Sequence, residues 1–180
     1  MGVRIETALL KFLLGWAAVF AFRFLLLPFR PPNVEPVLAT VMPFSKRYGI
    51  LGSFLFAFLS IVLYDAVTSG WGSWTWITAC TYGAVAIGSY FYFKNREATR
   101  FNFVTYGIMG TLVYDAITMM AGPVLGHQSF AVALAGQIPF TALHLAGTIA
   151  FALTLSPIIY RWVVTNEALE FSFGTRKRSI

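Results

Sequence analysis

The sequence predicts an all-α integral membrane protein, on the basis of its composition, the length of its apolar runs and the placement of its basic residues. Of 180 residues, 58% are hydrophobic and only 11% are charged, whereas about a quarter of the residues of a soluble domain carry charge. Mean hydropathy is +0.72. Because a helix needs about 20 apolar residues to cross a bilayer, roughly five to seven spans would use most of the chain. We therefore expect one membrane domain over residues 1–180.

Apolar runs separated by helix-breaking residues define six predicted spans. They lie at about 8–27, 34–44, 48–66, 75–93, 101–121 and 137–164. The first run has the basic flank of a signal peptide but no convincing cleavage site, so we interpret it as a helix. Four prolines between residues 28 and 36 interrupt helical geometry and predict a short, proline-bent second helix. Pro139 is expected to separate a short outer segment from the last span.

The basic residues predict the topology, because lysine and arginine in short loops favour the cytoplasmic side of a membrane. Six spans place most of them on one side, namely Arg4, Lys46 with Arg47, the group at 94–100 and the tail group at 176–178. Arg30 and a snorkelling Arg23 remain outside. We therefore expect a multi-pass protein of the bacterial cytoplasmic (inner) membrane, with both termini cytoplasmic. The net charge of +6 is then a topology signal, and no nucleic-acid partner is expected.

Polar side chains gather at the predicted outer end, beside loops 28–33, 67–74 and 122–129. The motif YDAVT at 64–68 recurs as YDAIT at 114–118, which places Asp65 and Asp115 at similar depth. A carboxylate within the membrane costs about 2.5–3.5 kcal/mol, so each aspartate needs either a structural partner or a ligand. Both interpretations stay open. His127 in the third loop could be a ligand or a hydrogen-bond donor, and His144 lies within a helix. For both, a hydrogen-bonded structural histidine is the more common case.

Cys80 is the only cysteine and lies in the aromatic stretch WGSWTWITACTYG, residues 71–83. One cysteine excludes an internal disulfide, and the chain has no zinc-type cysteine and histidine spacing, so we predict no bound metal ion. On the predicted helix, Cys80 shares a face with Trp76 and Gly83, which could hold a flat ligand. The alternative is a buried cysteine that fills space, since unpaired cysteines are often buried.

The order of elements along residues 8–164 resembles a known family. An AxxxA patch at Ala17 and Ala21 in an apolar first helix is followed by a proline-rich link, a short second helix, a helix ending YDAVTSG, and WTWITA. Together these features resemble the S components of energy-coupling-factor (ECF) vitamin transporters. The resemblance implies a six-helix protein that captures a vitamin in a pocket near the outer surface.

The resemblance also implies a partner. In that family the AxxxA patch docks onto a coupling module, which consists of a transmembrane coupling protein and two ATPases, and here the patch corresponds to Ala17 and Ala21. Solitary members lack a dedicated module and can act alone. The chain has no Walker A sequence, so it is not itself the ATPase.

The single cysteine makes the chain most similar to the solitary cobalamin-specific S components. This implies that the Cys80 thiolate binds the cobalt of cobalamin, which is the transported ligand, and can promote loss of cyanide from cyanocobalamin. That decyanation is the only catalytic role we expect. The predicted substrate-binding residues are Cys80, Tyr64, Asp65, Thr68, Trp71, Trp74, Trp76, Asp115 and His127.

Three alternatives stay open. The first is an S component for another vitamin or precursor, such as a flavin, thiamin or a queuosine precursor, with Cys80 as a structural residue. The second is a membrane thiol-redox enzyme, which is disfavoured because such enzymes generally need paired cysteines. The third is a structural membrane protein with no ligand.

Overall fold

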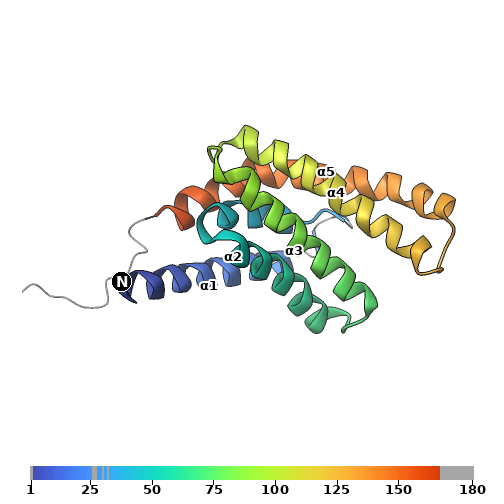
Figure 1. Cartoon of the computed structure of the whole chain (residues 1–180), viewed down its shortest axis with the longest axis horizontal. Coiled ribbons are helices and arrows are strands. Elements are labelled where there is room, and N and C mark those ends of the chain that lie inside the picture. The colour runs from blue at the N-terminus through green and yellow to red at the C-terminus, as the bar shows by residue number, and fades with distance from the viewer. Residues whose placement is uncertain (1, 26–27, 30, 32, 167–180) are drawn as a thin grey trace, which may run out of the picture.

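The chain folds into a bundle of helices, which confirms the all-α prediction (Figure 1). The computed structural model describes residues 2–25, 28, 29, 31 and 33–166. The described elements are α1 (Gly2–Leu25), α2 (Val37–Thr68), α3 (Ser73–Lys94), α4 (Arg100–Val124), α5 (Phe130–Ile159) and the short π-helix η1 (Tyr160–Val164). Three helical stretches are long and apolar enough to cross a membrane: Val37–Thr68, Arg100–Val124 and Phe130–Val164. These stretches indicate a membrane protein.

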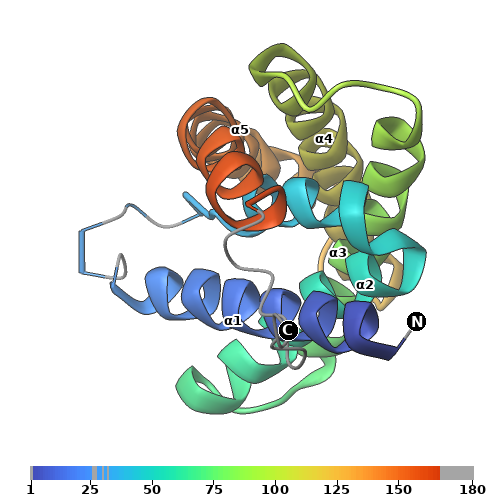
Figure 2. The same ribbon diagram turned by 90° about the vertical axis from the view of Figure 1, so that its left-hand side faces the viewer.

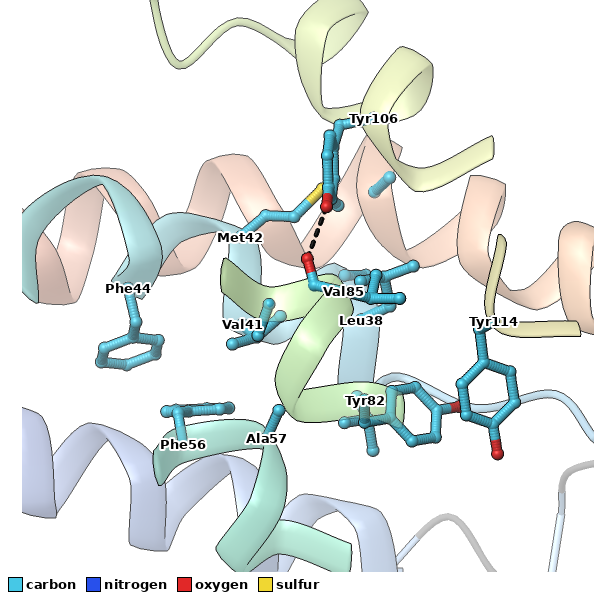
Figure 3. Packing of buried hydrophobic residues seen from close by; sticks show 14 of the residues in the cluster. Leu38, Val41, Met42, Phe44, Phe56, Ala57, Tyr82, Val85, Tyr106 and Tyr114 are labelled. Carbon is cyan, nitrogen blue, oxygen red and sulfur yellow. Dashed lines mark hydrogen bonds between the residues drawn. The ribbon is translucent and has the colours of Figure 1, made fainter. Parts of the chain in front are cut away.

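Helix α2 is sharply kinked at Gly49, whose φ of 73° and ψ of −167° are not helical. The rings of Phe44 and Phe56 stack with their centroids 4.6 Å apart. In a straight helix, residues twelve positions apart are separated by about 18 Å. The chain therefore reverses direction at Gly49, and Phe44 of the first half packs against Phe56 of the second half (Figure 3).

The predicted count of six helices is not supported, because the structure describes five α-helices in residues 2–25 and 33–166. The predicted spans 34–44 and 48–66 both fall within α2, on either side of the kink at Gly49. The basic residues Lys46 and Arg47 predict a cytoplasmic connection between two spans at this point. They lie instead on helical backbone immediately before the reversal.

Contrary to the prediction, Pro139 does not separate a short outer segment from the last span. Helix α5 runs through it without interruption. A proline removes one backbone hydrogen bond, and in membrane helices neighbouring groups commonly make up for that loss. The predicted outer segment and the last span are therefore one helix.

The first half of α2 forms the centre of the bundle. Every residue from Val37 to Ser45 is buried. Figure 3 shows Leu38, Val41 and Met42 in this core, among side chains from the other helices. Hydroxyl groups connect this segment to its neighbours: the Ser45 and Ser89 hydroxyls lie 2.7 Å apart, and Ser156 donates to the backbone carbonyl of Ala39. Such polar contacts between helices are common where the surroundings are apolar.

The α1–α2, α2–α3 and α4–α5 connections lie at one end of the molecule. At the opposite end, Lys11 of α1 donates to the backbone carbonyl of Asn166, and Lys46 donates to the backbone carbonyl of Arg96 in the α3–α4 connection. Most of the described lysines and arginines lie near this end. Figure 2 shows α1 on one side of the bundle and α4 with α5 on the other. The tail group at 176–178 and Arg30 lie outside the described residues.

Candidate functional site

A cavity of about 440 Å³ opens at the end of the bundle opposite Lys46. All five α-helices line it, together with the segment before α2 and the α2–α3 connection. Its lining combines charged groups, hydroxyl groups and aromatic rings. Ligand cavities of about 300–1,000 Å³ are typical for small molecules, so this cavity is large enough to hold one.

An ion pair closes the side of the cavity next to α1. Arg23 Nε donates to Glu35 Oε2 over 2.9 Å, and Arg23 Nη1 donates to the backbone carbonyl of Ser60 over 3.2 Å. The guanidinium carbon lies 3.5 Å from the centre of the Tyr64 ring. The Arg23 side chain is only 8% exposed. Its charge is therefore neutralised by Glu35 and its plane is held by Tyr64.

A second polar group comes from α3, α4 and α5. His144 Nδ1 lies 2.8 Å from Asp115 Oδ1, and His144 Nε2 lies 3.2 Å from the Tyr82 hydroxyl. Asp115 and His144 are almost fully buried, yet His144 also lines the cavity. Among the residues that the structure describes, Asp115 Oδ2 has no hydrogen-bond partner. The carboxylate fixes the orientation of the imidazole, and the imidazole presents its other nitrogen to Tyr82.

One face of α3 forms a wall of the cavity. Trp74, Thr78 and Tyr82 all line it, and their spacing of four residues places them on one side of a helix. In the first turn of α3, which begins at Ser73, the Thr75 hydroxyl accepts a hydrogen bond from the Gly72 backbone N–H over 3.1 Å. This bond satisfies one of the free N–H groups before the first turn. This hydrogen bond therefore fixes the orientation of the first turn of α3, and with it the face that lines the cavity.

The loop between α2 and α3 covers the cavity. Gly70 adopts a φ of 77°, which a residue with a side chain rarely adopts. The turn folds Trp71 back so that its Nε1 donates to the backbone carbonyl of Val62 over 3.0 Å. Trp71, Gly70 and Ser69 all line the cavity.

A second cavity of about 350 Å³ adjoins the first. The two share the side chains of Trp74, Thr78, Tyr114 and Phe140 in their linings. The second cavity extends between α4 and α5 and is lined by uncharged side chains, including Gln128 and Gln137. In the part of the chain that is described, all charged lining groups therefore belong to the first cavity.

Several predicted site residues come together here. Asp65, Trp71 and Trp74 line the first cavity, as expected from the loop at 67–74. Asp115 lies behind the cavity wall and reaches it through His144. Tyr64 packs against the guanidinium of Arg23.

Other predicted residues lie elsewhere. Cys80 is exposed and is absent from the lining of both cavities. It lies two residues beyond Thr78, which is a rotation of about 200° around the helix. Trp76 is on the same outward face as Cys80, and its ring contacts Phe58 and Trp71. The structure therefore directs Cys80 away from the cavities.

The remaining predicted residues are exposed. The Thr68 hydroxyl donates its hydrogen bond to the backbone carbonyl of Tyr64 in its own helix. His127 lies in the turn after α4. Ala17 and Ala21, the predicted docking patch, lie on the outward surface of α1.

The sequence interpretation missed several lining residues. They are Arg23, Asn33, Glu35, Thr75, Thr78, Tyr82, Tyr114, Phe140 and His144. One signal could have identified two of them: Arg23 and Glu35 are opposite charges on either side of a proline-rich link in an otherwise apolar region. Burial in such a region requires charges to pair.

Within the described residues, no cluster of three or more histidine, cysteine, aspartate or glutamate side chains could hold a metal ion. No protein-family model matches the chain, and neither a curated protein nor a solved structure matches it. Any functional proposal therefore depends on the geometry of the cavities and on the sequence pattern.

Proposed function

We propose that this protein is the substrate-binding subunit of a membrane transporter, and that it captures a small water-soluble nutrient in the first cavity. The observation that carries the proposal is the 440 Å³ cavity, which brings Arg23 with Glu35, Asp65 and His144 to one end of an apolar bundle. A structural helix bundle has no need for this combination, because burying charged and polar groups costs free energy.

The topology supports capture from outside the cell. The cavity lies at the end of the bundle away from Lys46, Lys94 and Arg96. Basic residues mark the cytoplasmic side, so the cavity faces outward, in a cytoplasmic membrane. Aromatic side chains of the loop and of α3 stand at its entrance, and exposed tryptophans suit the membrane interface.

The resemblance to S components of ECF transporters supports the same role. Those proteins bind their vitamin near the outer surface under external loops, and here the loop at 69–72 covers the cavity. The exposed alanines Ala17 and Ala21 leave a flat surface on α1 for a coupling partner. Small residues let a second helix approach closely.

The size of the cavities favours a small vitamin or precursor over cobalamin. Cobalamin is larger than the drug-sized ligands for which cavities of about 300–1,000 Å³ are typical. Cobalt ligation would also require the ligand to lie on the outward face of α3, where Cys80 is exposed. Cobalamin uptake with Cys80 as cobalt ligand stays a prediction, and the Cys80→Ala experiment below tests it.

The experiment is purification of the protein in a mild detergent, followed by mass spectrometry of small molecules released on denaturation. We expect a stoichiometric nutrient of low molecular weight that raises the melting temperature when it is added back. The variant Trp74→Ala should lose binding at least about tenfold, since the indole lines both cavities.

Trp162→Ala is the matched control, because Trp162 is a similarly exposed tryptophan outside both cavities. It should bind as the wild type does. Equal binding by Trp74→Ala and Trp162→Ala, or the absence of any released molecule, would contradict the proposed function.

A further inference from the structure

The first cavity carries information about the charge of its substrate. We propose that the substrate is an organic cation with a flat ring, such as a protonated or quaternised nitrogen heterocycle. This inference rests on the proposed function and goes further by naming the chemical class of the ligand. It follows from the charges, the hydrogen bonds and the aromatic rings of the described lining.

The described lining has a negative balance. Arg23 and Glu35 neutralise each other through their ion pair. Asp65 adds a carboxylate that forms no side-chain hydrogen bond or ion pair with any residue in the described part of the chain, while its backbone carbonyl accepts from Ser69 and Gly70. Asp65 is therefore available to a ligand.

Asp115 and His144, the pair behind the cavity wall, do not make the net charge of the lining positive. If His144 is protonated, it compensates Asp115, and if it is neutral, the pair adds a further negative charge. Among the described residues, the buried Asp115 Oδ2 has no hydrogen-bond partner, and any negative charge on this carboxyl group acts on the cavity through a medium of low dielectric constant. The lining is negative in both protonation states.

An anionic substrate has no available counter-charge among the described residues. Arg23 is the one arginine or lysine of the described lining, and its Nε is bonded to Glu35. Its Nη1 is bonded to the carbonyl of Ser60, and Tyr64 covers its face. Binding an anion there would require these contacts to be broken.

The aromatic rings of the cavity favour a cation as well. Trp71, Trp74, Tyr82, Tyr114 and Phe140 contribute to its lining. The rings of Tyr82 and Tyr114 lie with their centroids 4.1 Å apart (Figure 3). The faces of aromatic rings attract cations, and the attraction increases when water is excluded. A flat cation can therefore stack on these rings while its charge approaches Asp65.

The test uses three probes with the same pyridine ring: the anion nicotinate, the neutral nicotinamide and the cation 1-methylnicotinamide. Binding to the purified full-length protein is measured by saturation-transfer NMR at concentrations up to about 10 mM. We expect 1-methylnicotinamide to bind at least about tenfold more tightly than nicotinamide, with nicotinate weakest. Equal binding of the three, tightest binding of nicotinate, or no binding of 1-methylnicotinamide would overturn the inference.

Variants of Asp65 test whether this carboxylate causes the preference for the cationic probe. Asp65→Asn should reduce the preference for 1-methylnicotinamide over nicotinamide at least about fivefold, whereas Asp65→Glu should keep it. Glu97→Gln is the control, because Glu97 is an exposed carboxylate outside the first cavity. An unchanged preference in Asp65→Asn would contradict the role of that carboxylate. Melting temperatures of all variants show whether a loss reflects unfolding.

The outcomes separate this inference from the proposed function. A preference for nicotinate, together with a co-purified anionic nutrient, overturns the cation inference and leaves the transporter role intact. If no probe binds and no molecule co-purifies, both fail. If a neutral nutrient co-purifies and the three probes bind equally, only the cation inference fails.

Discussion

His144 Nδ1 lies 2.8 Å from Asp115 Oδ1, although the two residues belong to different helices and are 29 positions apart. Both side chains are almost fully buried. The hydrogen bond joins α4 to α5 directly behind the first cavity, and His144 extends the connection to Tyr82 on α3. The two hydrogen bonds of His144 therefore join three helices at the proposed binding site.

Asp115→Ala should destabilise the protein by about 1.5–3 kcal/mol, because it leaves the buried His144 Nδ1 without its acceptor. The measurement is the melting temperature in detergent. Glu97→Ala, at an exposed carboxylate, is the control and should change stability by less than about 0.5 kcal/mol. Equal melting temperatures for the two variants would show that the buried pair contributes little.

Cys80→Ala should leave substrate binding unchanged within about twofold, because the thiol is exposed and outside both cavities. The affinity of the co-purified nutrient is measured for wild type and variant. The same pair of proteins is then titrated with cyanocobalamin and followed by absorption spectroscopy. A cobalt spectrum that changes with wild type and not with Cys80→Ala would support cobalamin ligation by Cys80.

Gly49→Ala should cost about 1–3 kcal/mol, because a φ of 73° with a ψ of −167° is accessible essentially to glycine alone. No heavy atom outside its chain neighbours lies within 4 Å of the added methyl group, so the cost arises from the backbone and not from a clash. The measurement is thermal unfolding in detergent. Gly136→Ala is the control, since its methyl group also meets open space but its backbone is helical. A loss as large in Gly136→Ala would refute the backbone explanation.

Gly136→Leu should fill the second cavity. Gly136 lines that cavity, and an added side chain there meets no neighbouring atom within 4 Å of its first carbon. If the substrate extends from the first cavity past Trp74 and Phe140, its affinity falls by about tenfold or more, and we expect this result. Unchanged affinity, measured by calorimetry with an unchanged melting temperature, would confine the substrate to the first cavity.

The sequence was sufficient to predict the helical class and part of the site. Apolar composition predicted helices, and the predicted topology, with the loop at 67–74 at the outer end, placed Asp65, Trp71 and Trp74 together. These three are close in sequence, so local signals determine where they lie. The count of six helices is not supported, because the predicted spans 34–44 and 48–66 belong to one helix, α2, which is kinked at Gly49.

The rest of the site depends on contacts between distant residues. Nothing local to Asp115 indicates that His144 is its partner, because the approach of α4 to α5 decides it. The face of α3 that lines the cavity could not be predicted from the sequence either. Tryptophan occurs on both of its sides, at Trp74 and Trp76, so residue type did not distinguish the cavity face from the outward face.

The reversal at Gly49 also has a mechanical consequence. Glu35 lies two residues before the first half of α2, and Asp65 lies near the end of the second half. The two carboxylates are therefore at the far ends of two helical arms that meet at Gly49. The pivot is at the end with Lys46, and the tips border the cavity. A few degrees of rotation at this joint would be magnified along each arm into a displacement of the cavity wall.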